Sequence, residues 1–137
     1  VDHSDTFMSV NNLGILLEDK GDYEGAEKFY RRALEGQEKV LGPDHPDTLM
    51  SVYNLGILLN KEGDLNGALE LLRSHATLSP EAEDAFGYNL ACYECLAGNL
   101  EEAKIVIAKH LEAHPEKREN ALKDEDFAAI RDFIEIL

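Results

Sequence analysis

The sequence predicts an all-α protein built as an array of similar helical hairpins, and three observations support this. The stretch from His3 to Ala26 reappears 42 residues later as His45 to Ala68, with 16 of 24 positions identical. A looser third copy, YNLACYECLAGNLEEA, lies 35 residues beyond the second, and helix-favouring Leu, Ala, Glu and Lys dominate the composition. Repetition at this period is typical of a solenoid, whose units bury their apolar faces against each other.

Chain length, net charge and cysteine content narrow the possible classes of protein. A chain of 137 residues fits one domain, which we expect to cover residues 1–137. The formal charge of −15 repels phosphate backbones and anionic lipids, so nucleic acid and membrane surfaces are poor partners. No apolar run approaches the roughly 20 residues that span a bilayer, and two cysteines three residues apart make no disulfide framework. We therefore expect a cytoplasmic protein.

The first hairpin is predicted to pair a helix over residues 4–20 with a second over residues 23–40. Apolar residues recur at mixed spacings of three and four in the first helix, as expected for an element buried on two sides. Gly21 supplies the turn, because glycine can adopt a left-handed conformation at a helix end. Gly42 and Pro43 then end the second helix.

Two further hairpins follow the same scheme. The second is predicted to pair helices over residues 46–61 and 65–78, and the third to pair residues 81–97 with 100–113. Ser79-Pro80 and His114-Pro115 stop the second helix of each pair, because the residue before proline avoids the helical conformation. The repeats thus run over about 4–42, 46–80 and 81–115.

The last residues, 116–137, read as a short helix over 117–123 and a longer one over 125–136. Phe127, Ile130, Phe133 and Ile134 share one side of the longer helix, with charged residues largely on the other. Such an amphipathic helix can cover the open end of a stack. We predict that it is a cap.

The three units share a pattern of small and large residues that resembles the tetratricopeptide repeat. Counted from Phe7, Leu49 and Asp84, each unit has leucine at its seventh position and a small residue at its eighth. The matching residues are Leu13, Leu55 and Leu90, then Gly14, Gly56 and Ala91, the turn glycines Gly21, Gly63 and Gly98, the alanines Ala26, Ala68 and Ala103, and Pro80 and Pro115. The resemblance implies a right-handed α-α superhelix of three repeats followed by a capping helix.

The first two units also resemble the longer repeats of kinesin light chains. They share a 42-residue spacing and the connector LGPDHPDT, whereas the third unit follows at the ordinary spacing of 35 residues. The chain carries no heptad region like that of a kinesin light chain. The likeness therefore concerns the type of repeat.

By this resemblance, a concave groove lined by the first helix of each hairpin binds a peptide. The candidate groove residues are Asn11, Asn12, Ile15, Tyr53, Asn54, Ile57, Tyr88, Asn89 and Cys92. Asn12, Asn54 and Asn89 occupy equivalent positions and form a ladder of amides, each able to donate to and accept from a peptide backbone. The alternative is that these amides bond to neighbouring helices. The Lys and Arg positions with which related repeats clamp the carboxylate of chaperone tails are Asn11, Ile15, Ala85 and Asn89 here, which disfavours such tails.

Other candidate sites are weaker. Cys92 and Cys95 have the spacing of half a zinc site, but no second cysteine pair is present, so we expect no metal and no cofactor. His110 and His114, spaced by four, could ligate a metal, although structural roles are favoured for both. The rings of His3 and His45 are placed to cap the helices that follow them.

The sequence therefore predicts a non-catalytic adaptor for a neutral or basic protein or peptide. No arrangement of nucleophile and base points to an enzyme. The alternative is a structural module that associates with itself or with further repeats through the uncapped first helix.

Overall fold

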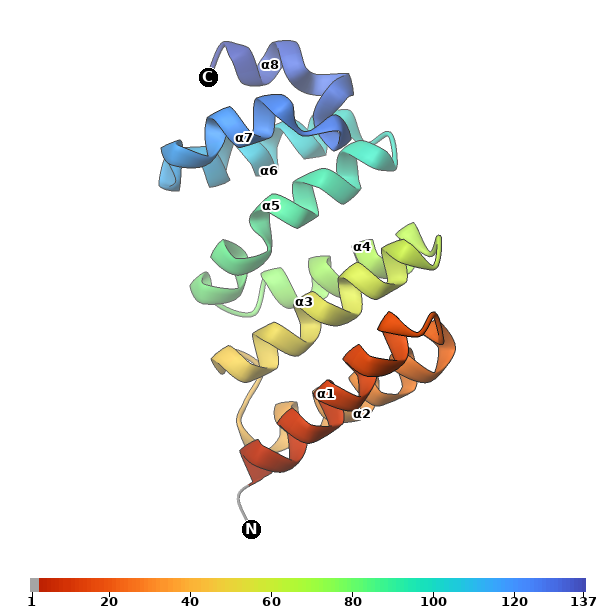
Figure 1. The fold of residues 1–137 in the computed structure, drawn as a ribbon. Coiled ribbons are helices and arrows are strands. Elements are labelled where there is room, and N and C mark those ends of the chain that lie inside the picture. Colours follow the sequence, from red (N-terminus) through yellow and green to blue (C-terminus); the bar gives the residue numbers. More distant parts are fainter. Residues whose placement is uncertain (1–2) are drawn as a thin grey trace.

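The computed structural model describes residues 3–137, with side chains from residue 6 onward, and it confirms the predicted all-α fold. Three helical hairpins stack in chain order, with shorter helices at the C-terminal end (Figure 1). The hairpins pair α1 (His3–Asp19) with α2 (Tyr23–Val40), α3 (Pro46–Lys61) with α4 (Leu65–Ala76), and α5 (Pro80–Leu96) with α6 (Leu100–Ala113). After them come the 3₁₀-helix η1 (Pro115–Lys117), α7 (Arg118–Lys123), the 3₁₀-helix η2 (Glu125–Ile130) and α8 (Arg131–Glu135).

Each hairpin turns at a glycine with positive φ. These are Gly21 at 85°, Gly63 at 86° and Gly98 at 85°, a conformation that residues with a side chain rarely adopt. The next residue caps the following helix in the first two turns, where Asp22 accepts from the Gly25 amide and Asp64 from the Gly67 amide. A Cβ on Gly25 would lie 2.5 Å from the Asp22 carboxylate, so a side chain there would require that carboxylate to shift.

The connectors between hairpins are capped as well. His45 precedes α3, and its Nδ1 accepts a hydrogen bond from the Asp47 amide at 3.1 Å, which confirms the predicted cap. Ser79 does the same for α5, where its hydroxyl accepts from the Ala82 amide at 3.0 Å. The matching prediction for the ring of His3 lies outside the described side chains.

The helix α4 ends at Ala76, before the predicted residue 78. Near its end, the Ser74 hydroxyl donates to the Leu71 carbonyl and the Thr77 hydroxyl donates to the Ser74 carbonyl. Such local bonds compete with the helical ladder. Arg73, Ala76 and Thr77, at this end of α4, line a hollow described below.

Small residues lie where paired helices cross. Ala26, Ala68 and Ala103 are fully buried. A Cβ on Gly14 would lie 2.5 Å from the ring of Tyr30, so only glycine fits this crossing. At Gly56 the same atom would lie 3.5 Å from Leu72, an ordinary contact, so a single methyl group would clash at Gly14 but not at Gly56.

The C-terminal segment differs from the single helix predicted over 125–136. It forms η2 and then α8, with the break at Ile130, whose φ of −122° and ψ of 17° are not helical. In a 3₁₀-helix, side chains three residues apart eclipse, so Phe127 and Ile130 both point inward. Phe127, Ile130 and Ile134 are buried, and η2 packs on α5 and α6 while α8 packs on α6.

Candidate protein-interaction groove

A hollow of about 290 Å³ lies between α1 and α3 and brings together four of the predicted groove residues. These are Asn11, Asn12 and Ile15 from α1 and Asn54 from α3. Exposed side chains of Met8 and Met50 form apolar walls, and Gln37 and Asp47 complete the lining. The hollow therefore combines amides with flexible apolar surface, a mixture suited to a peptide.

Asn11 is held in one orientation by a buried relay. Its Nδ2 donates to the Ser51 hydroxyl at 2.8 Å, and that hydroxyl in turn donates to Oε1 of Gln37. Only 9% of Asn11 is exposed, and its Oδ1 is a buried acceptor with no hydrogen-bond partner among the described residues. A buried acceptor without a partner is unfavourable by about 1–3 kcal/mol. A hydrogen-bond donor from a bound molecule would therefore be stabilising there.

The ladder amides of Asn12, Asn54 and Asn89 are not used within the fold. In the part of the chain that the structure describes, none of the three side chains makes a hydrogen bond to another residue. Asn12 is exposed, and Asn54 and Asn89 are half-buried. The alternative in which these amides satisfy neighbouring helices therefore finds no support in the described contacts.

A second hollow, of about 300 Å³, collects three more predicted residues, namely Tyr53, Tyr88 and Asn89. Its other walls include Glu116, Lys117 and Asn120, which come from η1 and α7. The C-terminal segment thus forms part of this wall. Ile57 lies half-buried on α3 and lines neither hollow.

Cys92 is not in a groove, contrary to the prediction. It is 4% exposed, because η2 and the residue before it lie over this part of α5, where Asp124 and Asp126 approach the sulfur closely enough to interact with it. Burial, followed by the two carboxylates, raises the pKa of the Cys92 thiol well above its usual value. Cys95 is buried beside it, with its pKa also raised by burial. A thiol in such surroundings is a poor nucleophile.

Tyr88 anchors the segment that covers Cys92. Its hydroxyl donates to Asp124 Oδ2 at 2.8 Å and accepts from Asn120 Nδ2 at 3.2 Å. Its ring meets Phe127 edge to face, with centroids 5.3 Å apart. Burial and the bond to Asp124 raise the pKa of Tyr88. Of the predicted groove residues on α5, only Asn89 is left half-open without such a bond.

The outer face of α1 carries an exposed apolar pair. Leu13 and Leu16 are 48% and 55% exposed, whereas Leu55 and Leu58, the identical residues 42 positions later, are fully buried. The helix α2 packs against α3, on which Leu55 and Leu58 lie. The face of α1 thus repeats a surface that elsewhere receives a helix.

Gln37 and Ser51 were missed by the sequence reading. Their relay to Asn11 depends on how the first two hairpins dock, which the sequence alone does not reveal. The available signal was that Ser51 repeats Ser9, each serine lying between a methionine and a valine.

Comparison with known proteins agrees with the helical-hairpin fold. The family model described as tetratricopeptide repeat matches residues 5–81, more than half of the chain. No curated protein matches the sequence. Within the described residues, no helix has the length and apolar character needed to cross a bilayer.

Proposed function

Because the chain belongs to the tetratricopeptide repeat family, we propose that it is a non-catalytic adaptor that holds an extended segment of a partner protein between α1 and α3. Repeats of this family generally mediate interactions between proteins. The likeness of the first two units to kinesin-light-chain repeats supports the same reading. The proposal adds to the family's general role a location and a set of contacts.

The buried Oδ1 of Asn11 is the observation that carries this proposal. The relay through Ser51 orients the amide before any ligand arrives, and a small side-chain movement that uncovers Oδ1 would let a backbone N–H of the partner donate to it. Asn12 and Asn54 offer further amides in the same hollow. Met8 and Met50 can adapt to the apolar side chains of the partner.

Coverage of α5 shortens the proposed groove. Cys92 is buried and Tyr88 is engaged by Asp124, so of the predicted groove residues on α5 only Asn89 remains available. We place the main contacts on the first two hairpins. The net charge of −15, with Asp47 in the hollow, favours a neutral or basic segment and speeds its encounter at low salt.

The test begins with a peptide library screened against the whole chain. For a selected peptide, Asn11→Ala should weaken binding by about fivefold, because one hydrogen bond contributes roughly 1 kcal/mol. Asn66→Ala is the matched control, since Asn66 is exposed on α4 and lines neither hollow. Melting curves check that both variants are folded. Equal affinity for a folded Asn11→Ala variant would reject the site.

A second candidate function rests on Leu13 and Leu16. Their exposure favours association of α1 with another helical hairpin, either a second copy or a further repeat. A measured mass above one chain that falls to one chain in Leu16→Glu would support this function. A mass of one chain at high protein concentration, with the peptide still bound, would leave the adaptor function alone.

A further inference from the structure

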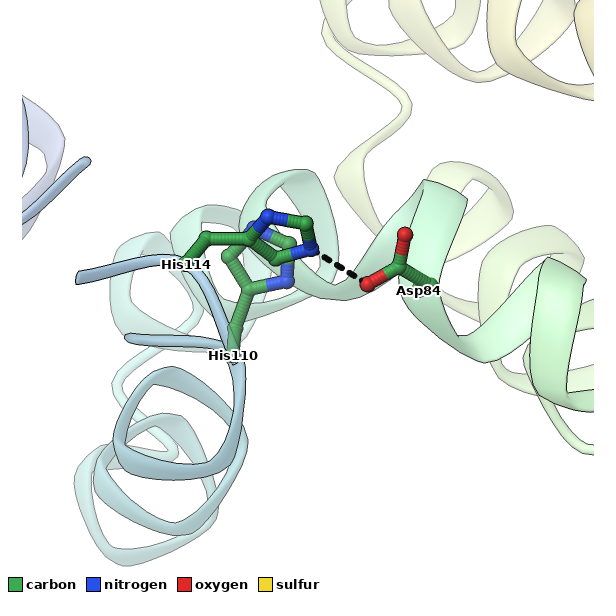
Figure 2. A group of neighbouring side chains, drawn as sticks. All are labelled: Asp84, His110 and His114. Atoms are coloured by element: carbon green, nitrogen blue, oxygen red, sulfur yellow. Dashed lines mark hydrogen bonds and ion pairs between the residues drawn. The ribbon is translucent and has the colours of Figure 1, made fainter. Parts of the chain in front are cut away.

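Three metal-ligating side chains meet where α5 begins and α6 ends. Asp84 lies near the start of α5, His110 in the last turn of α6, and His114 directly after that helix. The centroids of the two imidazoles lie 4.7 Å apart, and Figure 2 shows His114 turned toward the Asp84 carboxylate. One ring nitrogen of each histidine and one Asp84 oxygen all lie within 4.8 Å of one another.

The third hairpin departs from the other two at this place. Position one of each unit is Phe7, Leu49 and then Asp84, so an acid replaces two apolar residues. In the first hairpin, the ring of Phe7 packs over Gly36 near the end of α2. At the corresponding junction, the third hairpin has the carboxylate of Asp84 and the imidazole of His114. Apolar packing alone would not require these polar groups.

A second difference between the third hairpin and the other two makes space for His110. Gly87 stands where the other units have Val10 and Val52, and a Cβ on Gly87 would lie 2.7 Å from Nδ1 of His110. The ring is buried, and its Nε2 has no hydrogen-bond partner among the described residues. A buried imidazole with an unused nitrogen is unfavourable as a purely structural element.

His114 already has the arrangement typical of a metal-ligating histidine. Its Nε2 faces Asp84, while its Nδ1 lies 3.4 Å from a carboxylate oxygen of Glu116. In metal sites the second ring nitrogen usually donates to such a carboxylate, which fixes the tautomer and orients the ligand. Glu116 is placed to do this for His114.

We propose that Asp84, His110 and His114 bind a divalent transition-metal ion, with Zn²⁺ the best match. Two imidazoles and one carboxylate suit zinc, whereas Mg²⁺ and Ca²⁺ prefer oxygen ligands. Zinc bonds of about 2.0–2.2 Å at tetrahedral angles bring ligand atoms to roughly 3.3 Å apart, so small side-chain rotations suffice. Asp84 and His110 also line a hollow of about 420 Å³ beside α4, which gives the ion an entry path and room for a water ligand.

The test is Zn²⁺ titration of the full chain, free of any histidine tag, by isothermal calorimetry. We expect one Zn²⁺ per chain and a melting temperature that rises with Zn²⁺, because binding favours the folded state. Asp84→Asn and His114→Gln should each weaken binding by at least tenfold, and Mg²⁺ should not compete. Circular dichroism without metal checks that the variants are folded.

Two control variants separate this site from other groups. His75→Gln removes an imidazole whose Nε2 lies 2.9 Å from Glu38 Oε1, away from the proposed site. This substitution should leave the Zn²⁺ affinity unchanged. Cys92→Ser tests the buried group of Cys92, Asp124 and Asp126. If Cys92→Ser abolishes binding, or if folded Asp84→Asn/His114→Gln binds Zn²⁺ as tightly as the parent, the proposed site is wrong.

Discussion

Replacing Phe127 with alanine should loosen the C-terminal end of the chain while the first two hairpins stay folded. Phe127 is fully buried, and its ring packs edge to face on Tyr88 of α5. It belongs to η2, which lies over the part of α5 that carries Cys92 and Cys95. Removing the ring therefore takes away one of the buried apolar contacts that hold this covering segment.

The expected loss follows from the size of the side chain. Truncating a buried phenylalanine to alanine destabilises a fold by about 3–5 kcal/mol, of which the edge-to-face pair accounts for about 0.5–1.5 kcal/mol. Every 1.4 kcal/mol changes an equilibrium constant tenfold, so 3 kcal/mol corresponds to roughly a hundredfold increase in the open state. In a repeat array this loss should remain local to the end of the stack.

Thiol labelling measures that opening. The chain has two cysteines, both buried under the segment, and burial raises the pKa of each thiol, so labelling near neutral pH requires the segment to open. The labelling rate of Phe127→Ala should exceed that of the parent by about a hundredfold when closing is fast. Circular dichroism should still show a folded helical chain.

Ile136→Ala is the matched control, because Ile136 lies in the same segment but is 83% exposed. Its labelling rate should stay within a few-fold of the parent, since exposed substitutions usually change stability by less than about 0.5 kcal/mol. If Phe127→Ala labels no faster than Ile136→Ala, the segment does not protect the thiols and the reasoning fails.

Two further predictions concern packing and charge. Gly14→Ala should destabilise the fold by about 1–3 kcal/mol, because the added methyl meets the Tyr30 ring, whereas Gly56→Ala should be neutral or stabilising by up to about 1 kcal/mol. Urea unfolding measures both, and equal losses would contradict this account. Arg73→Ala should destabilise the fold by about 2–3 kcal/mol, because it leaves the buried carboxylate of Glu94 without its cation. The loss should be smaller than for a fully buried pair, since Arg73 is half exposed and Asn99 Nδ2 still donates to Glu94 at 3.0 Å. Adding Glu94→Gln should recover part of that loss, and a double variant no more stable than Arg73→Ala would refute the argument.

The helices were predictable because the residues that start and end them act locally. Gly21 and Gly63 take the positive φ that their turns need, and His45 caps the helix after its connector, so each boundary is set by a few adjacent residues. The small residues buried between paired helices, such as Ala26 and Ala68, were already visible as equivalent positions of the repeat. Where local bonds compete, as at Thr77, the predicted end was two residues late.

The site was less predictable because it depends on docking between distant segments. The sequence around Cys92 does not indicate that residues more than 30 positions later cover it. The break at Ile130, after which α8 begins, is also not evident from the amphipathic pattern of residues 125–136. Likewise, Gln37 and Ser51 become a relay only once α2 and α3 are packed. Asp84 and His114 needed the same tertiary information.

The linear stacking of the hairpins has a consequence for regulation. The extensive contacts run from each helix to the next, from α1 and α2 through to α5 and α6, and η2 closes back on α5. Interactions this local carry little coupling free energy between the two ends, and linkage is reciprocal. A peptide held between α1 and α3 should therefore leave the opening of the C-terminal segment unchanged, and a metal ion at His110 should leave peptide affinity unchanged. An allosteric effector of this chain would have to act on the hairpin that it touches.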